Sequence, residues 1–163
     1  MTINKINPVV KTSFLIIIFY LLFIISRTFR IAPSIISMLM PFGILFLKKG
    51  YSVIYSVVLI ILINISGFVV ESIGIFLLFM VPVLIYNTFQ KKVVRHSLIT
   101  IFSVTSFFIM YYFFGYLLHD FFLRNNLTWL LLLLYIVFAN LYGFLLNRLK
   151  KEIENFVKKE EYK

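Results

Sequence analysis

The chain has 163 residues, of which 62% are hydrophobic and 13% are charged, and its mean hydropathy is +1.02. Soluble proteins use roughly 45–50% apolar residues, so this chain has too few polar residues to coat a soluble globule. The absence of cysteine excludes a disulfide framework, a thiolate metal site and a cysteine nucleophile. The net charge of +10 indicates basic cytoplasmic loops of a membrane protein rather than nucleic-acid binding, because no exposed domain is large enough to bind nucleic acid.

Charged residues divide the chain into uncharged segments that are dominated by Leu, Ile, Phe and Val. A membrane-spanning helix needs about 17–25 such residues, and five segments reach that length. The first segment has 15 residues, but Lys11 and Arg27 can extend toward the interface and lengthen it. The segments are 12–26, 31–47, 50–70, 72–90, 97–118 and 125–147. The sequence therefore predicts an all-α polytopic membrane protein with six transmembrane helices, which satisfy their own backbone hydrogen bonds in lipid.

The distribution of basic residues predicts the orientation. With the N-terminus inside, the predicted inner segments carry thirteen Lys and Arg residues, whereas the outer loops carry only Arg27, Arg30 and Arg124. Because basic residues accumulate in cytoplasmic loops, this division predicts that both termini are cytoplasmic, N-in/C-in. We expect a multi-pass protein of the bacterial cytoplasmic (inner) membrane.

Two regions follow from this layout: a six-helix transmembrane domain over residues 1–147, and a cytoplasmic basic amphipathic tail over residues 148–163. In the tail, Leu149, Ile153 and Phe156 recur at helical spacing among Lys and Glu, so the sixth helix should continue into the cytoplasm. The tail could lie on anionic lipid headgroups, which is the favoured interpretation, or dock a cytosolic partner.

Signatures of catalysis are missing from the sequence: it has no Gly-x-Ser-x-Gly motif, no glycine-rich phosphate loop and no zinc pattern. His96 and His119 should lie on opposite sides of the membrane and cannot share a metal. The pair His119-Asp120 fits an interfacial position better than a general base. No charged residue falls deep in a predicted helix, which disfavours ion-coupled transport. We therefore expect neither an enzyme nor a cofactor site.

Two asparagines are the clearest polar residues within the predicted helices. Asn64 lies in Ile-Asn-Ile-Ser-Gly, and Asn140 lies in Phe-Ala-Asn-Leu-Tyr-Gly. We expect both to form interhelical polar contacts, worth roughly 1 kcal/mol each. Pro41 and Pro82 lie inside predicted helices and predict kinks. Close helix contact is possible at Gly43, Gly74, Gly115 and Gly143.

This layout resembles the bacterial rod shape-determining protein MreD family over nearly the whole chain. Local features that are similar are the helix entry at Ala32-Pro33, the basic turn Lys48-Lys49-Gly50, and Asn140 in the last helix before the basic residues from Arg148 onward. Family members often carry glycines in the third helix and an acidic residue near its outer end. This chain has a Val, Leu and Ile run there, followed by Asn64.

The resemblance implies a non-catalytic scaffold of the cell-elongation complex, which guides lateral peptidoglycan synthesis. Its partners would be membrane lipids and MreC-like and RodA-like membrane proteins, together with the MreB filament. An alternative is the substrate-binding membrane subunit of an energy-coupling-factor vitamin transporter. Such subunits usually show an alanine-rich face on the first helix, whereas residues 14–25 contain no alanine. A membrane protein with neither role is a third possibility.

Overall fold

The structure is a computed structural model that describes residues 7–114 and 127–161. All secondary structure within these two ranges is helical, so the predicted all-α class is confirmed for them. The elements are α1 (Pro8–Phe29), α2 (Pro33–Leu39), the 3-10 helix η2 (Met40–Phe46), α3 (Lys49–Ile65), α4 (Val69–Gly74), the π-helix η3 (Ile75–Met80), α5 (Val81–Thr88), α6 (Lys92–Phe114) and α8 (Thr128–Glu161).

Four helical stretches are long and apolar enough to cross a membrane. They are Pro8–Phe29, Val69–Thr88, Lys92–Phe113 and Thr128–Phe156. The second and third predicted segments correspond to Pro33–Phe46 and Lys49–Ile65, which are apolar but shorter. Six spans and their orientation thus stay a prediction, whereas the helical nature of the six apolar segments is established in the described ranges.

The third helix ends earlier than the sequence predicts. The uncharged segment runs to Val70, but α3 stops at Ile65 because Gly67 adopts a φ of +91°. The Gly67 N–H donates to the carbonyl of Asn64 at 3.0 Å, and the Phe68 N–H donates to that of Ile63 at 3.3 Å. A glycine with positive φ, followed by backbone hydrogen bonds back to the last turn, is a common helix end. Because α3 ends here, Asn64 lies in its last turn.

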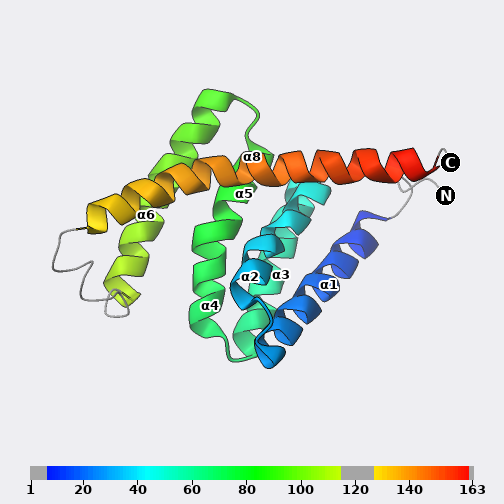
Figure 1. The fold of residues 1–163 in the computed structure, drawn as a ribbon, viewed down its shortest axis with the longest axis horizontal. Helices are drawn as coiled ribbons and strands as arrows, with labels where there is room; N and C mark the ends of the chain where they lie inside the picture. Colours follow the sequence, from blue (N-terminus) through cyan, green and yellow to red (C-terminus); the bar gives the residue numbers. More distant parts are fainter. Residues whose placement is uncertain (1–6, 115–126, 162–163) are drawn as a thin grey trace.

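The last helix lies across the others rather than alongside them (Figure 1). α1 packs against α3, and α6 packs against α8, while α8 also contacts η2 and α5. α8 is one unbroken helix of 34 residues, so it continues past Asn147 as far as Glu161. The boundary at residue 147 between the predicted membrane domain and tail is therefore not a break in secondary structure.

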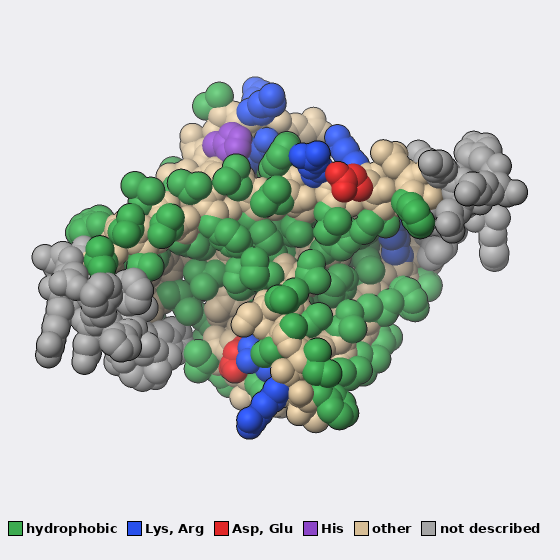
Figure 2. All heavy atoms as spheres, viewed as in Figure 1, with side chains coloured by type: hydrophobic (Ala, Val, Ile, Leu, Met, Phe, Trp, Pro, Cys, Tyr) green, Lys and Arg blue, Asp and Glu red, His purple; other side chains and the backbone are tan. Residues whose placement is uncertain are grey.

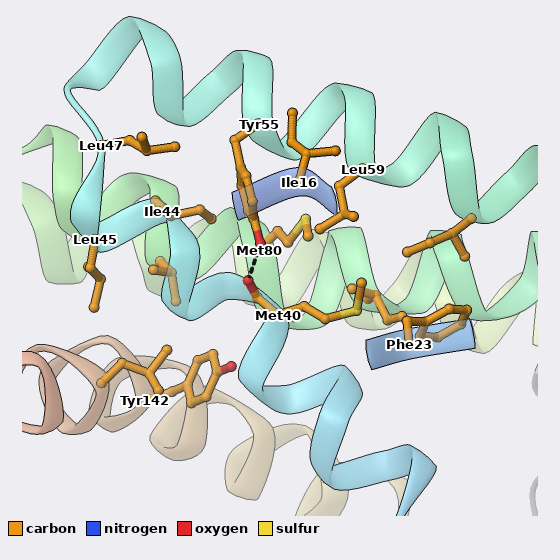
Figure 3. Close-up of a cluster of buried hydrophobic side chains, with 14 residues drawn as sticks. Ile16, Phe23, Met40, Ile44, Leu45, Leu47, Tyr55, Leu59, Met80 and Tyr142 are labelled. Atoms are coloured by element: carbon orange, nitrogen blue, oxygen red, sulfur yellow. Dashed lines mark hydrogen bonds between the residues drawn. The ribbon is translucent and has the colours of Figure 1, made fainter. Parts of the chain in front are cut away.

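The buried core gathers around η2, as Figure 3 shows. Met40 and Ile44 from η2 are fully buried, together with Tyr55 and Leu59 from α3 and Met80 from η3. Outside this core the surface is apolar over most of the helices (Figure 2). On α1, for example, Phe14 is 62% exposed and Ile17 is 56% exposed. So much exposed apolar surface matches a lipid solvent rather than water.

Two of the four glycines singled out in the sequence lie at very close contacts. A Cβ added to Gly43 would come 2.6 Å from Cζ of Tyr55, and one added to Gly143 would come 2.7 Å from Cγ of Tyr86. Gly74 has more room, because a Cβ there would meet Met110 Cε at 3.8 Å. The fourth, Gly115, lies outside the described residues.

We expect the Gly43→Ala substitution to destabilise the protein, because the new methyl group would collide with the ring of Tyr55. Overpacking of this kind costs about 1–3 kcal/mol. The matched control is Gly50→Ala, since nothing lies within 4 Å of a Cβ at Gly50. Thermal unfolding in detergent, followed by circular dichroism, should give a lower midpoint for Gly43→Ala only. Equal midpoints for the two variants would contradict the close contact.

Candidate functional site

The second apolar segment changes from α-helix to 3-10 helix at Met40, beside Pro41. Proline has no N–H, so a proline inside a helix deprives the carbonyls of the preceding turn of their usual donor. In this segment the affected carbonyls are those of Ser37 and Met38. The hydroxyl of Tyr142 in α8 donates a hydrogen bond to the Met38 carbonyl. A side chain from a distant helix thus replaces a backbone donor that the sequence lacks.

Further carbonyls of η2 also accept hydrogen bonds from side chains. The Tyr55 hydroxyl donates to the Met40 carbonyl at 2.7 Å (Figure 3). The Ser52 hydroxyl lies 3.1 Å from the Ile44 carbonyl and 3.3 Å from the Leu47 carbonyl. The donors Ser52 and Tyr55 come from α3, which follows η2 directly and therefore packs beside it.

Two more donors reach carbonyls of this region from other helices. Asn87 in α5 donates from Nδ2 to the Ile44 carbonyl at 3.3 Å and to Ser52 Oγ at 3.1 Å. Lys150 in α8 donates from Nζ to the Leu45 carbonyl at 2.7 Å. We call the carbonyls of this region the η2 carbonyl cluster; its members are those of Met38, Met40, Ile44, Leu45 and Leu47.

A second break occurs in the fourth apolar segment. The π-helix η3 ends at Met80, and Pro82 follows in the first turn of α5. Pro82 cannot donate to the carbonyls four and five residues earlier, which belong to Leu78 and Leu77. The hydroxyl of Tyr135 in α8 lies 3.4 Å from both of these carbonyls. The kinks predicted at both prolines therefore coincide with departures from α-helical geometry.

Both breaks are held by the same face of α8. Tyr135 and Tyr142 are seven residues apart, which is close to two helical turns, so their side chains project from one face. The ring of Tyr142 also stacks on Phe138, with centroids 5.1 Å apart, and contacts Phe79 edge-on at 5.8 Å. We call Tyr135 and Tyr142 the tyrosine clamp, because together they tie α8 to both broken segments.

The tyrosine clamp and the η2 carbonyl cluster are built from hydrogen bonds between helices. Unwound carbonyls in membrane helices can coordinate cations when they face a cavity. Here the carbonyls of the cluster accept hydrogen bonds from hydroxyl, amide and ammonium donors of other helices. Within residues 7–114 and 127–161, no group of three His, Cys, Asp or Glu side chains could hold a metal ion. The hydrogen bonds of the cluster join α3, α5 and α8 to the segment that contains α2 and η2.

Of the two asparagines that the sequence identifies, Asn140 lies between helices. Its Oδ1 is 2.8 Å from Nδ1 of His96 in α6, and its Nδ2 donates to Thr100 Oγ1 at 3.3 Å. The same amide donates to the carbonyl of Ile136 at 3.0 Å. His96 thus takes part in a link between α6 and α8.

Asn64 differs from the expectation of an interhelical contact. It is exposed in the last turn of α3, and its side chain makes no hydrogen bond within the described ranges. The reason is the early end of α3, which places Asn64 at the helix terminus. His119 and Asp120, considered above as an interfacial pair, lie outside the described residues.

The sequence patterns did not identify the residues that hold the breaks, especially Tyr135, Tyr142 and Ser52. One available signal was the seven-residue spacing of two tyrosines in a Leu-rich helix, in a chain whose other helices contain prolines. Comparisons of the chain with protein-family models, with curated proteins and with solved structures find no match.

We expect Tyr142→Phe and Tyr135→Phe each to lower the free energy of unfolding by about 0.5–1.5 kcal/mol, because each removes a donor to carbonyls that a proline has freed. The control is Tyr112→Phe, since Tyr112 is 84% exposed and donates no hydrogen bond within the described ranges. Unfolding in detergent with added denaturant should separate the clamp variants from the control. A clamp variant as stable as Tyr112→Phe would contradict this role.

Proposed function

We propose that the chain is a non-catalytic scaffold of the bacterial cytoplasmic membrane, with six membrane segments and both termini in the cytoplasm. The observation that carries this proposal is the use of the internal polar side chains. Tyr55, Tyr135 and Tyr142 donate to the chain's own backbone, as does Asn87. Polar groups occupied in this way hold a shape and are not available to convert or carry a substrate.

Contacts between basic segments support the proposed orientation. Lys11 in α1 and Lys150 in α8 both lie over the ring of Phe46, at 5.9 and 5.5 Å from its centroid. Three predicted cytoplasmic regions therefore meet at one end of the molecule. The predicted outer loops meet elsewhere, where Arg27 and Glu71 form an ion pair at 3.8 Å.

The two shorter segments are compatible with six spans. The 3-10 helix rises about 2.0 Å per residue, compared with about 1.5 Å for the α-helix. The segment Pro33–Phe46 is therefore on the order of 25 Å long, compared with about 21 Å if it were entirely α-helical. Local thinning of the bilayer accommodates a mismatch of a few ångströms against its hydrocarbon core of about 30 Å. The 3-10 stretch thus helps a short segment to reach across.

Within the scaffold class, the resemblance to the MreD family favours a role in the cell-elongation complex, with MreC-like and RodA-like partners. Such a role needs an exposed apolar surface on which the helices of another protein can pack. α1 offers one, because Phe14, Ile17 and Leu21 are each more than half exposed and lie on one face. On this proposal the clamp keeps that surface in a fixed shape.

For the orientation, we expect reporter fusions at Lys163 and at Glu71 to give opposite signals, cytoplasmic for Lys163 and external for Glu71. The basis is the division of basic residues and the ion pair of Arg27 with Glu71. A fusion at Lys91, in the predicted cytoplasmic loop, is the control and should match Lys163. The same signal at Lys163 and Glu71 would rule out six spans.

For the role, depletion of the protein in its rod-shaped host should give rounded, swollen cells. A photoreactive residue in place of Ile17 should form an adduct with the MreC-like protein, detected with an antibody against that partner. The adduct should disappear in cells that lack the partner. Unchanged cell shape together with tight retention of a vitamin by the purified protein would contradict the scaffold and favour the transporter subunit.

A further inference from the structure

A cleft with strongly basic walls opens where α5, α6 and α8 meet. Its volume is about 340 Å³. Four cationic side chains line it, two from the start of α6 and two from α8. They are Lys92, Arg95, Arg148 and Lys151. No carboxylate from the described residues lines the cleft.

Four like charges around one cleft repel each other, and one carboxylate nearby offsets this only in part. Glu152 lies 3.3 Å from Arg148, but both side chains are well exposed, at 64% and 70%. An exposed ion pair of this kind contributes little to stability, so it offsets little of the repulsion. The pair also leaves Lys92, Arg95 and Lys151 without an anionic partner among the described residues. An anion in the cleft would remove this repulsion, so the charge pattern points to an anionic ligand.

Arg95 is held in position by a chain of contacts across the cleft. Its guanidinium carbon lies 4.1 Å from the ring centroid of Tyr86, which is a cation–π contact. Tyr86 in turn packs against Gly143, where only a glycine leaves room for the ring. The Nε of Arg95 is buried and has no hydrogen-bond partner in the described part of the chain. A guanidinium held in this way suits a phosphate group, which it would bind through its terminal nitrogens rather than through the buried Nε.

The surroundings of the cleft distinguish a lipid phosphate from a free one. Phe144 lines the cleft and is 52% exposed, and Leu145 and Leu141 beside it on α8 are 56% and 53% exposed. Val93, next to Lys92 on α6, is 79% exposed. Apolar surface therefore borders the basic cleft, as an acyl chain below a bound headgroup would require. Basic pockets between helices on the cytoplasmic side of membranes commonly bind phospholipid headgroups.

We propose that this cleft binds the phosphate of an anionic phospholipid headgroup in the cytoplasmic leaflet, with Arg95 as its central ligand. The site differs from a diffuse attraction between a basic tail and the membrane, because it has walls, a fixed arginine and residues from three helices. It depends on the proposed orientation but not on the scaffold role.

The test measures lipid retention by the full-length protein, delipidated in detergent and then given phosphatidylglycerol, phosphatidylcholine or inorganic phosphate, with native mass spectrometry as the readout. We expect wild-type protein to retain phosphatidylglycerol and to release it neither to phosphatidylcholine nor to millimolar phosphate. The double variant Arg95→Gln/Lys151→Gln should retain it on the order of tenfold more weakly. The matched control Lys48→Gln/Lys49→Gln removes two exposed charges that do not line the cleft, and it should retain the lipid as wild type does.

Each other outcome decides against the proposal. Equal weakening in the cleft variant and the control would indicate diffuse charge attraction. Displacement of the lipid by millimolar phosphate would indicate a site for the free anion, and equal retention of phosphatidylcholine would exclude recognition of the anionic headgroup. If Arg95→Gln/Lys151→Gln does not fold, Lys92→Gln/Lys151→Gln replaces it, because both of these side chains are exposed and line the cleft. Retention unchanged in that variant would overturn the proposal.

Discussion

A proline within an apolar helix creates backbone carbonyls that need a donor, and in lipid no water can supply one. Each such carbonyl left unsatisfied costs several kcal/mol, so the helices must be arranged to bring donors to it. In this protein Tyr142 reaches the carbonyl freed by Pro41, and Tyr135 reaches those freed by Pro82. This requirement accounts for the course of α8, which must pass both breaks and therefore lies across the bundle (Figure 1).

The same helix joins the interior to the basic end of the molecule. Gly143 follows Tyr142 directly, and its close contact with Tyr86 positions Arg95 in the cleft. Two turns further along α8, Lys150 donates to the Leu45 carbonyl. The contact that positions Arg95 therefore lies next to the tyrosine clamp on α8.

These features together support the proposal of a scaffold that acts through its surface. The described internal hydrogen bonds join helices to each other, as Asn140 of α8 joins His96 of α6, and leave the outer faces apolar. A fixed, lipid-facing exterior suits binding to other membrane helices, and a basic cleft at one end suits an anionic headgroup. In the proposed orientation the apolar exterior would meet the helices of partner proteins, and the basic cleft would meet the cytoplasmic leaflet.

The sequence by itself determined the helical class, the six apolar segments and the two proline breaks, because composition and the missing proline N–H act locally. It also identified Gly43, Gly143 and Asn140 as residues for close or polar contacts. Only the tertiary structure decided which side chains satisfy the freed carbonyls, since Tyr142 lies more than a hundred residues from Met38. It also decided that Asn64 is exposed and that four basic residues form one cleft. These outcomes depend on which helix faces pack together, and local patterns do not specify that packing.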